Sequence, residues 1–168
     1  MRDVLRIRPR VAVGSPLSAY FAPRGSRSGG PPTPPADPNE RPGEASSLFV
    51  LIVDDAEDSR YIYEHYFSFA GVKTATAPDG AAALAAIEAH RPDAVILDPA
   101  MPKVTGWEVL ERLRADPRTR TIPVLVLSGQ MERESAIRAG ADAYCSKPCP
   151  PDEVLRQVQR LVERKRQP

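Results

Sequence analysis

The sequence predicts an α/β protein with a doubly wound parallel sheet of five strands and helices on both faces. From residue 48 onward, five short apolar segments alternate with five longer segments of helical character within about 120 residues. This alternation is the pattern of repeated β/α units. The strongest apolar segments are unbroken, as in parallel strands that are buried on both faces.

The five strands are expected at residues 48–53, 72–77, 94–97, 124–127 and 143–145. The second strand alternates between apolar and polar residues and the fifth is short, so both suit the edges of a sheet. The right-handed crossover rule then favours the flavodoxin-like order 2-1-3-4-5, because this order places the second and fifth strands outside.

Capping residues indicate where the helices begin. Asp58 is expected to cap a helix that reaches about residue 70, and Asp79 a helix that reaches residue 90. Residues 105–108 form a capping box for the third helix, and the fourth is expected at residues 130–140. The last helix carries apolar residues on one face, namely Val154, Leu155, Val158, Leu161 and Val162.

Residues 1–47 differ in composition from the remainder of the chain. They hold nine of the 19 prolines and seven Arg against four acids, whereas residues 48–168 carry 16 basic and 18 acidic groups. Such a segment buries too little apolar surface to offset its ordering entropy. We therefore expect a disordered Pro/Gly/Arg-rich arm at 1–47 and one folded domain at 48–168. A polyproline ligand at residues 32–35 is the alternative to a plain linker or to residues upstream of the true start codon.

Polar residues follow each strong strand. Asp54 and Asp55 end the first strand, Asp98 the third and Ser128 the fourth, while the fifth runs into Lys147. The carboxyl ends of parallel strands meet at one edge, and ligands bind there at the switch point between strands one and three. The sequence therefore predicts three carboxylates, one hydroxyl and one ammonium in one crevice.

Three crowded carboxylates are unfavourable alone, because like charges oppose ionisation. Mg²⁺ removes this cost and prefers carboxylates together with phosphate oxygens. Lys147 and the Ser128 hydroxyl could then neutralise and hydrogen-bond the remaining phosphoryl oxygens. Attack by Asp98 on phosphorus would give a labile acyl phosphate, which suits reversible signalling.

These residues resemble the receiver domains of bacterial response regulators, as in the single-domain chemotaxis regulators. The matching segments cover nearly all of residues 48–165 in the right order, namely Val53-Asp54-Asp55, Leu97-Asp98, Met101-Pro102, Gly106, Leu127-Ser128-Gly129 and Ser146-Lys147-Pro148. Each segment is weak evidence alone, and together they are highly specific.

The resemblance implies a metal site and an acceptor. It makes Asp98 the phosphoacceptor, Asp55 the more direct Mg²⁺ ligand and Asp54 a ligand through water. The backbone carbonyl of Ala100 would complete the protein ligands. The backbone amides of Ala100 and Gly129 would hold phosphoryl oxygens.

The resemblance also implies a switch. Ser128 and Tyr144 would form the switch pair, and the peptide bond after Lys147 would be cis. Pro99, Thr105 and Pro150 depart from the commonest family pattern. None of these three departures replaces one of the five charged or hydroxyl residues of the site. They therefore bear on the reaction rates and not on the chemistry.

The implied function is that of a stand-alone response regulator in a two-component or phosphorelay system. It would take its phosphoryl group from a sensor histidine kinase or a histidine phosphotransfer protein and would signal to an output protein. It would be a cytoplasmic switch that promotes its own phosphorylation and dephosphorylation, not an enzyme. With a net charge of +1, neither nucleic acid nor a membrane is an expected partner.

Three alternatives share parts of this pattern. A flavin-binding flavodoxin needs a polar, uncharged phosphate loop where residues 54–58 are mostly acidic. An aspartate-based phosphatase needs a second acid two residues after its nucleophile, where Ala100 stands. A pseudo-receiver, a binding module that is not phosphorylated, is the serious rival.

The two cysteines, Cys145 and Cys149, flank Lys147. Two thiols in a chain of this length predict no disulfide framework, which favours a reducing cytoplasm. With only two distant histidines available, zinc is not expected either. We expect one core cysteine and one loop cysteine.

Overall fold

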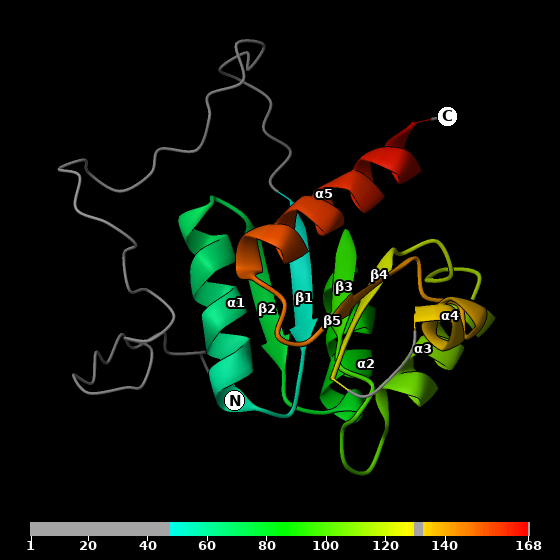
Figure 1. Cartoon of the computed structure of the whole chain (residues 1–168). Coiled ribbons are helices and arrows are strands. Elements are labelled where there is room, and N and C mark those ends of the chain that lie inside the picture. Colours follow the sequence, from blue (N-terminus) through cyan, green and yellow to red (C-terminus); the bar gives the residue numbers. More distant parts are fainter. Residues whose placement is uncertain (1–47, 130–132, 168) are drawn as a thin grey trace, which may run out of the picture. The chain divides into compact units, whose positions relative to one another are not determined.

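The computed structural model describes residues 48–129 and 133–167. Five parallel strands form one sheet in the order β2-β1-β3-β4-β5 (Figure 1). The strands are β1 Phe49–Val53, β2 Lys73–Ala77, β3 Ala94–Leu97, β4 Val124–Ser128 and β5 Ala143–Ser146. The predicted fold class and strand order are confirmed.

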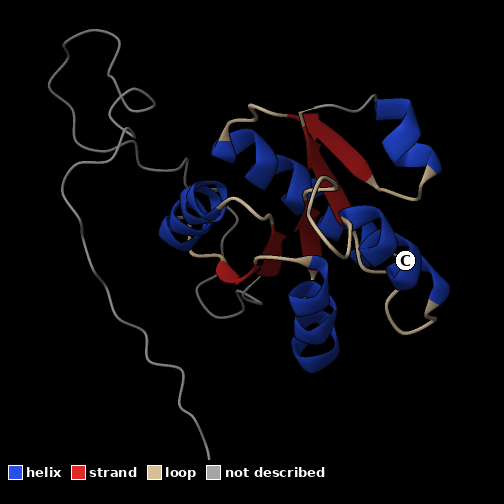
Figure 2. Cartoon of the chain, turned by 90° about the horizontal axis from the view of Figure 1, so that it is seen from below, coloured by secondary structure: helices blue, strands red, loops and turns tan. Residues whose placement is uncertain are grey.

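Helices cover both faces of the sheet. They are α1 Glu57–Phe69, α2 Gly80–His90, α3 Gly106–Ala115, α4 Arg133–Arg138 and α5 Pro151–Arg166. Figure 2 shows helices on either side of the strands. Helices α1 and α5 pack on one face, and α2, α3 and α4 pack on the other.

Strands β1, β3, β4 and β5 each contribute to two separate hydrophobic cores, because successive side chains point to opposite faces. In β1, Val50 and Ile52 face α1 and α5, whereas Leu51 and Val53 face α2 and α3. Both faces of the central strands are therefore buried, which explains why these strands are apolar throughout.

The capping predictions hold at two helices and fail at one. Asp79 accepts a hydrogen bond from the amide of Ala82, and Thr105 forms the predicted capping box with Glu108. Helix α1 instead begins after Ala56, which has no side-chain cap. Asp58 lies inside the first turn, because the helix begins two residues earlier than predicted, where the Ala56 amide donates to the Asp54 carboxylate (2.9 Å).

Two sequence predictions extend outside the described residues. The described part of α4 begins only at Arg133, whereas its predicted start at residue 130 lies in the gap. The proposed arm, residues 1–47, also lies outside the described residues, so the domain boundary stays a proposal. The predicted apolar face of α5 is confirmed, since all five of its apolar residues are buried.

Deletion of residues 1–46 should leave the melting temperature and the phosphorylation rate of the domain unchanged. The physical reason is compositional, since this segment is rich in proline and poor in core-forming residues. Differential scanning calorimetry of the full and shortened chains measures the effect. A melting temperature lowered by several degrees would contradict the boundary.

The prediction of two unpaired cysteines is wrong. Cys145, in β5, and Cys149, just before α5, form a disulfide. The chain turns sharply between these elements and brings the two Cα atoms to 6.2 Å, within the usual range for a disulfide. The four-residue spacing of the two cysteines does not by itself reveal this turn. Because the thiols are paired, they no longer support the prediction of a reducing compartment.

None of the helices in the described part of the chain combines the length and the apolar character needed to span a bilayer.

Candidate functional site

The carboxyl ends of β1 and β3 bring the predicted acids together. Val53 and Leu97 are partners in the ladder between these strands, so the residues that follow them emerge side by side. The amide of Asp98 also donates to the carbonyl of Val53 (2.8 Å). As a result, carboxylate oxygens of Asp54, Asp55 and Asp98 lie within 4.8 Å of one another.

The three carboxylates differ in their exposure. Asp54 and Asp98 are 2% and 7% exposed, whereas Asp55 is exposed. One oxygen of Asp98 accepts a hydrogen bond from the Ala100 amide (2.7 Å), and the other oxygen contacts Lys147. The cluster thus has two buried carboxylates in fixed orientations and one that faces solvent.

Lys147 joins the two buried carboxylates. Its Nζ donates to Asp54 Oδ2 (2.6 Å) and also to Asp98 Oδ2. Its own amide donates to the carbonyl of Ser128 (2.9 Å), which fixes the loop after β5 against the end of β4. The predicted cis bond between Lys147 and Pro148 is present.

The pKa of Lys147 lies above its ordinary value. Burial, the largest single effect, lowers the pKa, but the hydrogen bonds and charges of Asp54 and Asp98 together outweigh it. The folded protein therefore holds the ammonium form more strongly than the unfolded chain does, and Lys147 is a permanent cation at neutral pH.

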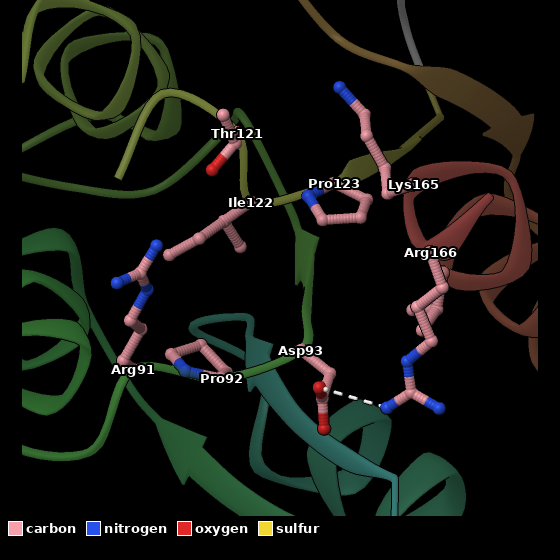
Figure 3. A pocket seen from close by; sticks show the side chains of 9 residues that line it. Arg91, Pro92, Asp93, Thr121, Ile122, Pro123, Lys165 and Arg166 are labelled. Atoms are coloured by element: carbon pink, nitrogen blue, oxygen red, sulfur yellow. Dashed lines mark hydrogen bonds and ion pairs between the residues drawn. The ribbon is translucent and has the colours of Figure 1, made fainter. Parts of the chain in front are cut away.

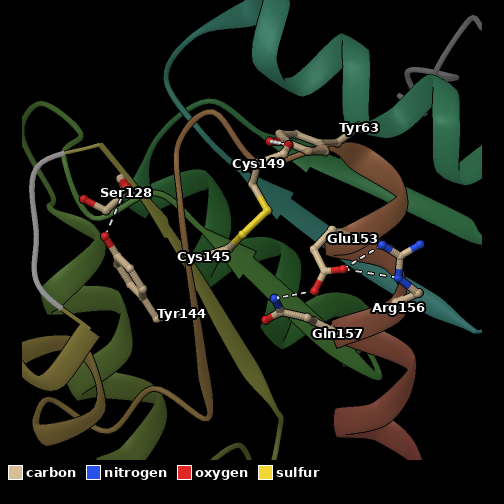
Figure 4. The surroundings of a disulfide bond; sticks show 8 residues. All are labelled: Tyr63, Ser128, Tyr144, Cys145, Cys149, Glu153, Arg156 and Gln157. Atoms are coloured by element: carbon tan, nitrogen blue, oxygen red, sulfur yellow. Dashed lines mark hydrogen bonds and ion pairs between the residues drawn. A yellow bond between two sulfur atoms is a disulfide. The ribbon is translucent and has the colours of Figure 1, made fainter.

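Ser128 and Gly129 lie at the end of the neighbouring strand β4, and Tyr144 lies in β5 beside it. Ser128 is buried at the end of β4, and Gly129 is exposed just beyond it. The Tyr144 hydroxyl donates to the Ser128 carbonyl (3.3 Å), and its partly buried ring packs against the core under α2 and α3 (Figure 4). Tyr144 lies within β5, and the other predicted site residues lie at the carboxyl ends of the strands or in the loops that follow them.

Two residues of α1 that the sequence reasoning missed also support the acids. Ser59 donates from its hydroxyl to Asp54 Oδ2 (2.7 Å). Arg60 donates to the backbone carbonyls of Asp54 (2.6 Å) and Asp55 (3.0 Å). Both lie in the first turns of the helix that follows the acids. The sequence feature that could have indicated them is a polar residue one helical turn or more after Asp54, at the start of that helix.

Gly106 is required by a close approach. A Cβ at this position would lie 2.6 Å from the Cα of Pro99, in the loop that carries the end of β3. The Gly106 amide also donates to the Pro99 carbonyl (3.2 Å). The start of α3 therefore packs directly on the backbone next to Asp98 and holds this loop in place.

The donor set fits Mg²⁺. Among the described residues, Lys147 is the one cationic side chain in contact with these carboxylates, so three negative charges face one positive charge. A divalent cation would balance the remaining two charges, and oxygen ligands are those that Mg²⁺ prefers. Asp55, as the exposed member, is accessible to a hydrated ion.

A separate pocket of about 150 Å³ lies away from this cluster. Figure 3 shows Asp93 and Pro123, which precede β3 and β4, among its lining residues. These positions are at the amino ends of the strands, so the pocket is on the opposite edge of the sheet. Its Asp93 pairs with Arg166 (3.2 Å) and is not part of the acidic cluster.

The family model of the response regulator receiver domain matches residues 50–159. The response regulator MprA of Mycobacterium bovis (strain BCG / Pasteur 1173P2) is 37% identical over 121 residues, which cover 70% of this chain and 52% of that protein. The chain thus spans about half the length of the MprA relatives that it matches.

Solved structures share the fold. The chemotaxis protein CheY4 of Vibrio cholerae has a TM-score of 0.65 and 32% identity, over 69% of this chain and 99% of that one. The receiver domain of the sensor histidine kinase PA1611 from Pseudomonas aeruginosa PAO1 has a TM-score of 0.65 and 26% identity, over 70% of this chain and 99% of that one. That structure has a magnesium ion coordinated in its active site cleft.

Proposed function

The chain belongs to the response-regulator receiver family, and on this premise we propose that it accepts a phosphoryl group on Asp98 in a Mg²⁺-dependent reaction. The supporting observation is the contact of Lys147 with both buried carboxylates beside exposed Asp55. The family is a signalling switch of two-component systems and is not generally classed as an enzyme.

The phosphoryl transfer would proceed at the edge between β1 and β3. An oxygen of Asp98 attacks phosphorus as the bond from phosphorus to the donor nitrogen breaks, and the donor imidazole leaves. Lys147 neutralises a phosphoryl oxygen, while the Ser128 hydroxyl and the amides of Ala100 and Gly129 donate hydrogen bonds to the others.

The metal would be held by Asp55 and Asp98 and by the Ala100 carbonyl, with Asp54 acting through water. Bound Mg²⁺ supplies electrostatic stabilisation of the phosphoryl oxygens. Ser59, which donates to Asp54, keeps that carboxylate oriented toward the cluster.

The donor would be a sensor histidine kinase or a histidine phosphotransfer protein, and the recipient of the signal an output protein. We propose a cytoplasmic location because such donors present their phosphohistidine there. We propose neither nucleic acid nor membrane as a partner. We also propose that the chain acts as a stand-alone regulator. In this it would differ from its MprA relatives, which are about twice as long as the segment that matches this chain.

Incubation of the protein with acetyl phosphate and Mg²⁺ tests this function. The intact mass should rise by one phosphoryl group, and EDTA should prevent the gain. The rival function, a pseudo-receiver that binds a partner without phosphorylation, predicts an unchanged mass with acetyl phosphate and with a phosphorylated histidine donor alike.

Replacement of Asp55 by Asn should lower Mg²⁺ affinity about 10- to 100-fold, because one anionic ligand is lost. Without Mg²⁺ the variant should be as stable as the original protein or more stable, since repulsion among the carboxylates is relieved. Calorimetric titration and urea unfolding measure the two effects. Asp58→Asn, an exposed acid outside the cluster, is the control, and equal Mg²⁺ binding by both variants would rule out the proposed ligand.

Phosphorylation should alter the face formed by α4, β5 and α5. The new charge on Asp98 draws the Ser128 hydroxyl inward, and Tyr144 moves from its partly buried position deeper beside β4. Hydrogen exchange with and without beryllofluoride, a phosphoryl mimic, measures the change. If hydrogen exchange changes only in the loops around Asp98 and stays the same at Tyr144, the result would instead favour a phosphorelay that uses the crevice mouth and α1.

A further inference from the structure

The disulfide between Cys145 and Cys149 encloses the loop that carries Lys147. Cys145 is in β5, where its ladder partner is Leu127 of β4. Cys149 is 6% exposed, and its carbonyl accepts a hydrogen bond from the Tyr63 hydroxyl of α1 (2.9 Å). One end of the ring is thus fixed to the sheet and the other to α1 (Figure 4).

The position of the cross-link favours a local role over a global one. The two cysteines are separated by only four positions, and a ring this short restrains the unfolded chain less than a long one does. Within this ring, however, Lys147 contacts Asp54 and Asp98. The bond therefore acts mainly on the loop that holds the ammonium in the site.

We propose that Cys145 and Cys149 form a reversible dithiol–disulfide site, whose oxidised form holds Lys147 firmly against the two buried carboxylates. Cys145 is partly exposed, so a reductant can reach the bond from solvent. In the reduced form the loop loses one covalent restraint and keeps the amide hydrogen bond of Lys147 to Ser128. The effect of this dithiol–disulfide site on phosphorylation rests on the function proposed above.

The reductant is a dithiol. Its thiolate attacks Cys145 Sγ, the bond between the sulfurs breaks, and Cys149 leaves as a thiolate that takes a proton from water. The second thiol of the reductant then attacks the mixed disulfide and releases Cys145 as a thiol. Two electrons pass to the protein, and the reductant closes into its own disulfide.

The experiment compares the full chain before and after treatment with dithiothreitol. Alkylation followed by intact mass should find no free thiol before reduction and two after it. Amide exchange in residues 144–150 should become about tenfold faster in the reduced form, while β2 at the far edge stays unchanged. Phosphorylation by acetyl phosphate should slow severalfold and recover on reoxidation.

The double variant Cys145→Ser, Cys149→Ser should match the reduced protein under both conditions. Two alkylated thiols in the air-oxidised protein, or a disulfide that resists reduction in the folded state, would overturn the proposal. Equal exchange of residues 144–150 in both forms would also overturn it. If neither form accepts a phosphoryl group, the proposed function fails, while the thiol and exchange results still decide the redox site.

Discussion

Asp98→Asn should abolish phosphorylation by acetyl phosphate, while the variant stays folded. The amide is a poor nucleophile, and the carboxylate of Asp54, the other buried acid, already accepts hydrogen bonds from Ala56, Ser59 and Lys147. Stability without Mg²⁺ should be unchanged or higher, because one of two adjacent buried negative charges is removed. Intact mass after incubation with the donor measures the loss.

The control for this variant is Asp58→Asn, which removes an exposed carboxylate from the same edge of the sheet. It should gain one phosphoryl group at the rate of the unmodified protein. Undiminished labelling of Asp98→Asn would show that another group is the acceptor.

Lys147→Met should lower the phosphorylation rate about 10²-fold, which is the usual effect of removing one preorganised charge or donor from a transition state. It should also destabilise the Mg²⁺-free protein by about 1–3 kcal/mol, since Asp54 and Asp98 are left buried without their shared cation. Lys73→Met, at an exposed position of β2, is the control and should change neither quantity.

The stability effect has a defined pH dependence. Because the folded protein raises the pKa of Lys147, the ammonium contributes its full stabilisation below the unfolded value, about 10.4, and loses it as the pH rises through the folded value. The difference between the original protein and Lys147→Met should therefore be constant near pH 7–9 and shrink above about pH 10.4. Urea unfolding across this range measures it, and a constant difference up to pH 11.5 would contradict the ion-pair account.

The order of the strands and the grouping of the polar residues could be predicted from the sequence, because both depend on patterns along single strands. Unbroken apolar runs identified β1, β3 and β4 as central, and the residues after them had to meet at one edge. The joint contact of Lys147 with Asp54 and Asp98 could not be predicted, since it depends on the turn after β5.

The predictions that failed, and the residues that were not predicted, also depend on contacts made across a turn. Cys145 and Cys149 come together only because the chain reverses between β5 and α5. Asp58 has the residue type of a helix cap, but the turn made by Asp54 moved the start of α1 to the preceding residues. Ser59 escaped notice because its role depends on how α1 lies over the end of β1. Local patterns do not specify contacts across a loop.

The central claim is that Asp98 carries the phosphoryl group. Borohydride reduces an acyl phosphate to an alcohol, so treatment of the phosphorylated protein should convert the modified aspartate to homoserine. Peptide mapping by mass spectrometry should find homoserine at residue 98 after incubation with acetyl phosphate and Mg²⁺, and none when EDTA is present. Homoserine at residue 54 or 55, or at no residue despite a gain in intact mass, would contradict the account.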